Sequence, residues 1–351
     1  MSAVKTSRRS LIVNVSLVVL AFGLLGLVVY QKWEEIAKVF RNPVDYKFFA
    51  LGFGIYMAAL TMTFARWHQL VRAQGLSFSI RDAVRLGFIG NVFNLVIPGA
   101  VGGDVIKAAY LCRMQPDRKP QAVASMVLDR ILGLLGLFLL AGIAGAATWS
   151  SADSQVKILI GMVWAGLSAG FAGLAVVFSP SLYRPLNRLV AGRGKFERAV
   201  RELEAIGLAY RRRLGTVVAM LGVATFGHAL YVLAFYVAST AIFRTLPTLV
   251  EHYLMVPLTL FTTAVPVPFG ALGFVEGISG KLFGLVHHDN GAIAMMAFRV
   301  LMYGSGLVGA CIYLANLRQV RSLAAEAGPM VDDAIEQTIV DPDMARTKTA
   351  S

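Results

Sequence analysis

The order of apolar and polar stretches along this 351-residue chain predicts its fold class. A run of about 20 apolar residues is long enough to cross the hydrocarbon of a bilayer as a helix. Polar and charged residues separate one such run from the next. The pattern therefore predicts an all-α polytopic membrane protein with about six transmembrane helices. The six runs are approximately 11–30, 48–67, 122–148, 157–178, 214–243 and 291–317.

Two further apolar stretches, 86–112 and 250–286, are interrupted in the middle by proline and glycine. Proline removes a backbone donor, and glycine leaves the backbone unrestrained. In hydrocarbon, interrupted backbone persists only where it is buried in protein or lines a wet cavity. We expect each stretch to form a re-entrant hairpin of two short helices. The residues that make the breaks are Pro98, Gly99, Gly102, Gly103, Pro268, Gly270 and Gly273.

The basic residues predict how the chain is oriented, because lysine and arginine gather in cytoplasmic loops. Arg66, Arg72, Arg81 and Arg85 are assigned to a loop before the first hairpin, and a basic cluster at 113–119 follows it. Both flanks are thus expected in the cytoplasm. The second hairpin has few basic neighbours and is expected to enter from the opposite side.

The same reasoning assigns the connecting segments. We expect 1–10 and the acidic tail 318–351 to be cytoplasmic, and 179–213 to be a basic cytoplasmic connector. The connector 31–47 is expected outside, although its four lysines and arginines disagree with that assignment. The localisation predicted is the plasma (inner) membrane, with both termini in the cytoplasm.

Each half of the chain contains two spans, a hairpin and a further span. The first half is 11–148, and the second comprises 149–178 and 214–317. Three crossings per half is an odd number, so the second half is expected to be inverted. Inverted repeats whose broken helices meet near the membrane midplane are typical of alternating-access carriers.

An acid and a later arginine recur in both halves. Asp104 follows the first break and Arg130 comes 26 residues later, whereas Glu276 follows the second break and Arg299 comes 23 residues later. An ionisable group within a membrane is costly and indicates a functional site. The two acids are therefore candidates for a proton or cation site. The alternative is that they only accept hydrogen bonds from the opened backbone.

The two arginines are candidate phosphate ligands, because the planar guanidinium group binds phosphate oxygens in a bidentate manner. The alternative is that they neutralise Asp129, Asp104 or Glu276. Further candidates are Lys107, which lies within one helical turn of Asp104, and Asn94, which either contacts the headgroup or links helices. His228 is favoured as a core residue over a proton relay.

Composition narrows the class of partner. Hydrophobic residues make up 57% of the chain, the mean hydropathy is +0.66 and the formal net charge is +13. The basic residues fall in clusters between apolar runs, which indicates contact with anionic lipid headgroups, not nucleic acid. No metal or cofactor motif is present, and two cysteines indicate no disulfide framework. We expect no metal and no cofactor.

The run GNVFNLVIPGAVGGDVIKAAYL, with Val127–Arg130, the later PxGxLGxxE segment and Arg299, resembles the lysylphosphatidylglycerol synthase transmembrane-region family. The resemblance covers most of 10–320. It implies a flippase-like membrane protein in lipid translocation or in envelope lipid or glycan assembly. About 30 residues follow the last span, so we expect no soluble aminoacyl-transfer domain and no synthase activity.

We therefore expect a flippase-like transporter that moves an anionic phospholipid or a polyprenyl-phosphate-linked lipid between leaflets of the bacterial plasma membrane, and not an enzyme. The alternatives are a membrane-embedded lipid-modifying enzyme, an ion or small-solute transporter, and a scaffold of an envelope-synthesis complex. The partners expected are a membrane lipid substrate and anionic headgroups. A homo-oligomer or an envelope-synthesis partner is left open.

Overall fold

A computed structural model describes residues 44–96, 102–179, 206–263 and 273–315, with isolated residues at 33, 34, 37, 194 and 204. The predicted first span at 11–30, most of both connectors and the acidic tail lie outside the described residues. So do four of the residues predicted to make the two breaks, namely Pro98, Gly99, Pro268 and Gly270.

The described residues form helices and no strand, which confirms the predicted all-α polytopic fold. The long helices and hairpin limbs are α3 (Tyr46–Ala73), α4 (Ile80–Val96), α5 (Gly102–Met114), α6 (Lys119–Thr148), α7 (Ser154–Phe178), α10 (Leu214–Thr240), α11 (Leu249–Thr262), α12 (Phe274–Gly284) and α13 (Gly291–Ala315). Five helical segments among them are long and apolar enough to cross a membrane: Tyr46–Ala73, Pro116–Thr148, Ser154–Phe178, Ile206–Thr240 and Gly291–Ala315.

Both interrupted stretches contain two short helices that pack against each other, α4 with α5 and α11 with α12. Local sequence explains where these helices begin. Thr248 caps α11 by accepting a hydrogen bond from the backbone nitrogen of Glu251, whose carboxylate accepts one from the backbone nitrogen of Thr248 at 2.6 Å. This reciprocal capping satisfies donors that a helix start otherwise leaves unpaired.

The two limbs of the first hairpin touch backbone to backbone. A Cβ atom placed on Gly103 of α5 would lie 1.9 Å from the carbonyl oxygen of Gly90 on α4. The side chain of Asn94 then accepts a hydrogen bond from the backbone nitrogen of Gly103 at 2.8 Å. Glycine is therefore required at Gly103, and α4 itself supplies the cap for α5.

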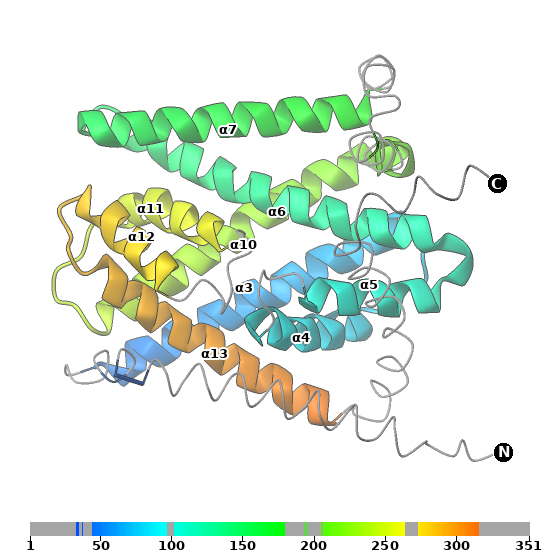
Figure 1. The fold of residues 1–351 in the computed structure, drawn as a ribbon, viewed down its shortest axis with the longest axis horizontal. Coiled ribbons are helices and arrows are strands. Elements are labelled where there is room, and N and C mark those ends of the chain that lie inside the picture. Colours follow the sequence, from blue (N-terminus) through cyan, green and yellow to red (C-terminus); the bar gives the residue numbers. More distant parts are fainter. Residues whose placement is uncertain are drawn as a thin grey trace, which may run out of the picture.

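The two halves pack in a reciprocal way (Figure 1). Helices α3 and α10 run side by side through the centre, α4 packs on α13, and α11 packs on α6. The first limb of each hairpin thus contacts the last helix of the other half. Helix α7 packs on α6 at one edge of the bundle. Reciprocal packing is what two equivalent halves require, and the inverted repeat itself stays a prediction.

The four arginines predicted to lie in a loop before the first hairpin are all helical: Arg66 and Arg72 belong to α3, and Arg81 and Arg85 to α4. Arg66 was assigned to the loop before the first hairpin, but α3 continues to Ala73, and the Arg66 side chain is buried inside the bundle. Helix α3 is 28 residues long, so its last two turns extend past the apolar run. The span predicted from hydropathy was too short at this end. A hydropathy scale gives arginine the same value whether its side chain is buried or solvated, so it could not show that Arg66 lies inside the bundle.

Candidate functional site

Asp104 holds two cations at the start of α5. Its Oδ1 atom lies 2.7 Å from Nζ of Lys107, one turn further along the same helix. Its Oδ2 atom accepts hydrogen bonds from the Arg130 guanidinium of α6. Asp104 and Lys107 are largely buried, whereas the Arg130 side chain is 45% exposed. Two positive charges therefore share one carboxylate, and the more accessible of them is Arg130.

The preceding residue of α6 forms a different ion pair. The Asp129 carboxylate accepts a hydrogen bond from Nε of Arg66 on α3 at 2.8 Å, and the Asp129 carbonyl accepts one from Nη2 at 3.2 Å. The Arg66 side chain is only 6% exposed. Burying two charges is stabilising only when they are paired in good geometry, as these two are. Asp129 thus compensates an arginine inside the bundle.

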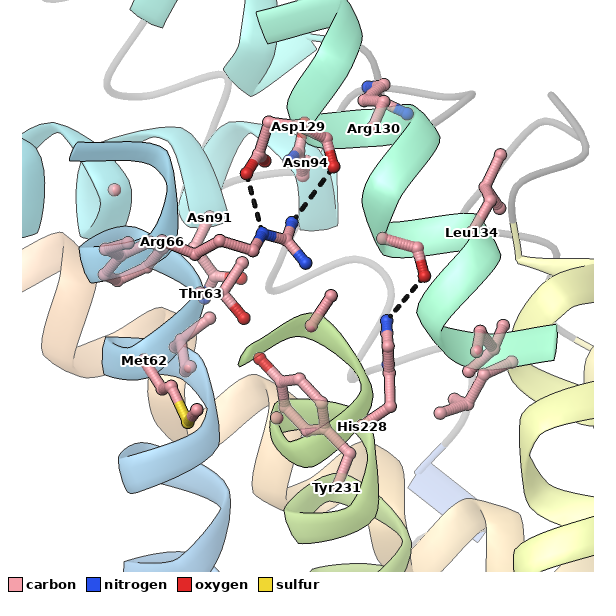
Figure 2. A pocket seen from close by; sticks show the side chains of 18 of the residues that line it. Met62, Thr63, Arg66, Asn91, Asn94, Asp129, Arg130, Leu134, His228 and Tyr231 are labelled. Atoms are coloured by element: carbon pink, nitrogen blue, oxygen red, sulfur yellow. Dashed lines mark hydrogen bonds and ion pairs between the residues drawn. The ribbon is translucent and has the colours of Figure 1, made fainter. Parts of the chain in front are cut away.

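Both ion-pair clusters line one cavity of about 360 Å³ between α3, α4, α5, α6, α10, α11 and α13. Figure 2 shows the Arg66–Asp129 pair of this cavity, with Arg130 next to it on α6. Its charged lining residues are Arg66, Asp104, Lys107, Asp129 and Arg130. The rest of the wall is mainly apolar and aromatic, with a few polar groups. The combination is that of a ligand pocket, in which apolar walls surround a small number of placed polar groups.

Polar side chains complete the wall. Asn94, besides capping α5, lines the cavity, and Asn91 donates a hydrogen bond to Ser305 Oγ of α13 at 3.0 Å. The Lys107 ammonium group lies 5.3 Å from the centre of the Trp67 ring, within the range of a cation–π contact. His228 of α10 also lines the cavity, and its Nε2 atom lies 3.0 Å from the carbonyl oxygen of Gly133.

The second acid and arginine are also paired, but in another environment. Arg299 of α13 donates to Glu276 of α12, and their side chains are 8% and 4% exposed. The other oxygen of Glu276 accepts a hydrogen bond from the backbone nitrogen of Gly273 at 2.7 Å, which caps α12. Gly273 has φ of +79°, a value that favours glycine. Among the described residues, neither Glu276 nor Arg299 lines the cavity.

The structure therefore brings five of the predicted residues to one cavity: Asn94, Asp104, Lys107, Asp129 and Arg130. The roles proposed for Glu276 and Arg299 stay predictions, and their geometry favours the alternative of mutual neutralisation. Gly102 lies in α5 at the hairpin break. The described residues contain no group of three or more His, Cys, Asp and Glu side chains that could hold a metal ion.

Sequence reasoning missed Arg66, together with Tyr56, Thr63 and Tyr231, which share the cavity wall. The hydroxyl-bearing residues lie in apolar spans, where no local pattern separates a cavity-lining tyrosine from a core tyrosine. For Arg66 a signal existed. It follows an apolar run directly and is followed in turn by Trp67, so a buried position near the span end was compatible with the pattern.

The helices and the cavity inside their bundle define a polytopic α-helical membrane protein with a polar, partly accessible site. The chain belongs to the family described as the lysylphosphatidylglycerol synthase TM region, whose family model matches residues 12–309. This match spans both hairpins and all five charged residues of the cavity, and it links the protein to lipid-related processes. No curated protein and no solved structure matches the chain.

Proposed function

We propose that this protein moves an anionic lipid between the leaflets of the bacterial plasma membrane, with the headgroup held in the cavity between α3 and α6. The observation that carries the proposal is the charge of the lining. Three cations, Arg66, Lys107 and Arg130, face two carboxylates, so the cavity has one excess positive charge. One phosphodiester group, as in an anionic phospholipid or a polyprenyl-phosphate-linked lipid, would neutralise it.

The accessible cation is suited to a phosphate group. A guanidinium group binds phosphate oxygens through two parallel hydrogen bonds, and Arg130 is nearly half exposed. Lys107 adds a second positive charge on the far side of Asp104. Carrying a bare charge through hydrocarbon is costly, and pairing it with fixed cations lowers that cost. The site therefore supplies what translocation of a phosphate requires.

The size and rim of the cavity favour a headgroup over a whole lipid. A volume of 360 Å³ corresponds to about a dozen water molecules at about 30 Å³ each. Two large apolar side chains of the wall, Leu134 of α6 and Phe261 of α11, are also exposed on the surface of the bundle. An apolar rim is compatible with acyl chains that stay in the bilayer while the headgroup enters. This arrangement favours lateral access from lipid.

The same experiment distinguishes this function from a membrane-embedded enzyme, an ion transporter and a scaffold. A membrane-embedded enzyme would convert the lipid, and an ion transporter would move charge without lipid. A scaffold would do neither, and replacing Asp104 would leave its function intact. We propose further that both termini are cytoplasmic, as the distribution of basic residues predicts. A homo-oligomer or an envelope-synthesis partner stays a prediction.

The test is a leaflet-exchange assay with the purified protein in vesicles, using fluorescent phosphatidylglycerol and phosphatidylcholine. The variants are Asp104→Asn, which releases Lys107 and Arg130, and Asp82→Asn as a control, which breaks the Asp82–Arg85 pair of α4 outside the cavity. We expect exchange of the anionic lipid by wild type and by the control, and loss in Asp104→Asn, because Lys107 and Arg130 without their carboxylate would hold the phosphate too tightly to release it. Wild type that exchanges neither lipid, or Asp104→Asn that matches wild type, would contradict the proposal.

A further inference from the structure

Two consecutive residues of α6 hold ion pairs with two different helices. Asp129 pairs with Arg66 of α3, and Arg130 pairs with Asp104 of α5. We call Lys107 and the more accessible Arg130 the outer station, and the buried Arg66 with Asp129 the inner station. Both stations line the same cavity. The members that α6 contributes to the two stations, Asp129 and Arg130, are consecutive residues, whose Cα atoms are about 3.8 Å apart.

We propose that the inner station is a second binding site for the phosphate of the lipid headgroup, reached from the outer station during translocation. The inference rests on the proposed function and extends it. It assigns Arg66, a residue that sequence reasoning placed in a loop, as a phosphate ligand. It also assigns Asp129 as the carboxylate that balances Arg66 while no phosphate is bound.

The position of Arg66 supports this role. It lies seven residues before the end of α3, about 10 Å along the helix, and its side chain is only 6% exposed, so its charge is buried within the protein, where an unpaired charge is costly. A Cβ atom on Gly133 of α6 would lie 3.4 Å from Nη2 of Arg66, so the guanidinium group rests against a residue without a side chain. Figure 2 shows this group in the middle of the cavity wall, with Tyr231 and His228 beyond it.

The groups around Arg66 suit a headgroup that carries hydroxyls beside its phosphate. The Tyr231 hydroxyl lies next to Thr63. Because the Gly133 carbonyl only accepts, Nε2 of His228 carries the proton, and its Nδ1 atom is a buried acceptor without a partner among the described residues. A glycerol or sugar hydroxyl reaching this end of the cavity would supply the missing donor. We therefore assign the ligand as a phosphodiester with a hydroxyl-bearing headgroup.

When a phosphate enters either station, it takes the place of a carboxylate beside an arginine. At the outer station a phosphate competes with Asp104 for Arg130, and at the inner station it competes with Asp129 for Arg66. In each case one anion replaces another against the same cation. The total charge of the cavity is therefore the same with the phosphate at either station. With Asp104 the outer station carries one net positive charge, whereas the inner station is neutral, so a phosphate is fully neutralised at the outer station and shares Arg66 with Asp129 at the inner one.

Replacing Arg66 and Asp129 together distinguishes a purely structural ion pair from a phosphate-binding station. Arg66→Gln with Asp129→Asn leaves no unpaired buried charge and keeps one excess positive charge in the cavity. Its matched control is Asp82→Asn with Arg85→Gln, which removes an arginine–aspartate pair outside this cavity. Arg66→Lys is the second variant, since it keeps the charge but loses the planar fork.

The measurements are the midpoint of thermal unfolding in detergent and leaflet exchange of fluorescent phosphatidylglycerol in vesicles. We expect the Arg66/Asp129 variant to fold and to exchange lipid at least tenfold more slowly, with the control equal to wild type. Arg66→Lys should keep wild-type stability and slow exchange severalfold. If the double variant does not fold, Arg66→Lys alone decides.

Different failures lead to different conclusions. Folded Arg66/Asp129 and Arg66→Lys variants that exchange lipid at the wild-type rate would overturn the inner station and leave the proposed function intact. Wild type without exchange would overturn the proposed function, and the inner station with it. Equal exchange of phosphatidylglycerol and phosphatidylcholine by wild type would overturn the assignment of an anionic, hydroxyl-bearing headgroup, since both lipids are phosphodiesters but only the first carries a net negative charge and headgroup hydroxyls.

Discussion

The two halves of the chain contain the same acid–arginine pair in two environments. In the first half, Asp104 and Arg130 line a cavity, and Arg130 is nearly half exposed. In the second, Glu276 and Arg299 are almost completely buried, and Glu276 also caps α12. In both, an acid in the first turn after a break meets an arginine of the next long helix.

The difference in exposure between Arg130 and Arg299 indicates which pair a ligand can reach. An exposed arginine exchanges its carboxylate for a phosphate at small cost, because water and nearby cations compensate the charge. The buried pair of Glu276 and Arg299 does not line the cavity of the described residues, so it cannot separate without leaving an uncompensated charge inside the protein. The pair of Arg66 and Asp129 is also buried, but it lines the cavity, where on our proposal a phosphate takes the place of a partner. On the proposed function, one motif serves as a binding element in the first half and as a structural link in the second.

The largest effect is expected from Arg299→Ala. It leaves the buried Glu276 carboxylate without its partner and should destabilise the protein by about 3–5 kcal/mol. Thermal unfolding in detergent would register this as a large drop in the midpoint. Glu276→Gln with Arg299→Gln should recover most of the loss, because no lone charge remains. Unchanged stability of Arg299→Ala would refute the structural role.

A smaller loss of stability is expected from Gly103→Ala in the first hairpin. The added Cβ would meet the Gly90 carbonyl oxygen at 1.9 Å, so α4 and α5 must separate, at a cost of about 1–3 kcal/mol. The matched control in the second hairpin is Gly277→Ala, where no described atom lies within 4 Å of the new Cβ. Equal unfolding midpoints for the two variants would show that the hairpin contact is not tight.

Arg130→Ala should have the opposite effect to Arg299→Ala: a small loss of stability and a large loss of lipid exchange. Because the Arg130 side chain is 45% exposed, its loss should cost only about 1 kcal/mol or less of stability. Leaflet exchange of anionic lipid should nevertheless fall by about tenfold or more, a difference that corresponds to about 1.4 kcal/mol. An unfolding midpoint as low as that of Arg299→Ala would place both pairs in the same structural class.

The smallest effect on stability is expected from the titration of His288, in the turn between α12 and α13. Burial lowers the pKa of His288 there, and the nearby Asp289 opposes the shift. The unfolded chain then binds a proton more readily than the folded one, so stability should decline as the pH falls below about 6.5.

His288→Phe should remove this part of the pH dependence, since phenylalanine does not titrate and packs against Phe243 and Phe283. The control is His287→Asn, because His287 is exposed and has φ of +58°, a value that asparagine tolerates. Unfolding midpoints at pH 7 and pH 5 give the comparison. The same pH dependence in His288→Phe and wild type would contradict the assignment.

Much of this fold was predictable because hydropathy and helix breakers act locally. The apolar runs determined the spans within the described residues, and proline with glycine determined where both hairpins break. The pairing of Asp104 with Lys107 was suggested by their spacing, and Asp104 was one of three carboxylates, with Asp129 and Glu276, considered as partners of the arginines. These features depend on residues close in sequence or on charges with few available partners.

What was not predictable depends on packing between the halves. The sequence contains no sign that α4 would pack on α13 or α11 on α6, yet this packing decides which acid–arginine pair faces the cavity. Arg66 was misplaced for a related reason. Only the position of Asp129 on the facing helix α6 shows that an arginine near a span end is buried and paired.

The division between the two pairs is tested most directly by counting the anionic lipid that the purified protein retains, using native mass spectrometry. Two charge-neutral double variants are compared, Asp104→Asn with Arg130→Gln and Glu276→Gln with Arg299→Gln. The account predicts that the first loses phosphatidylglycerol, whereas the second retains it as wild type does. Retention by both variants, or loss only in the second, would contradict the assignment of the first pair as the lipid site.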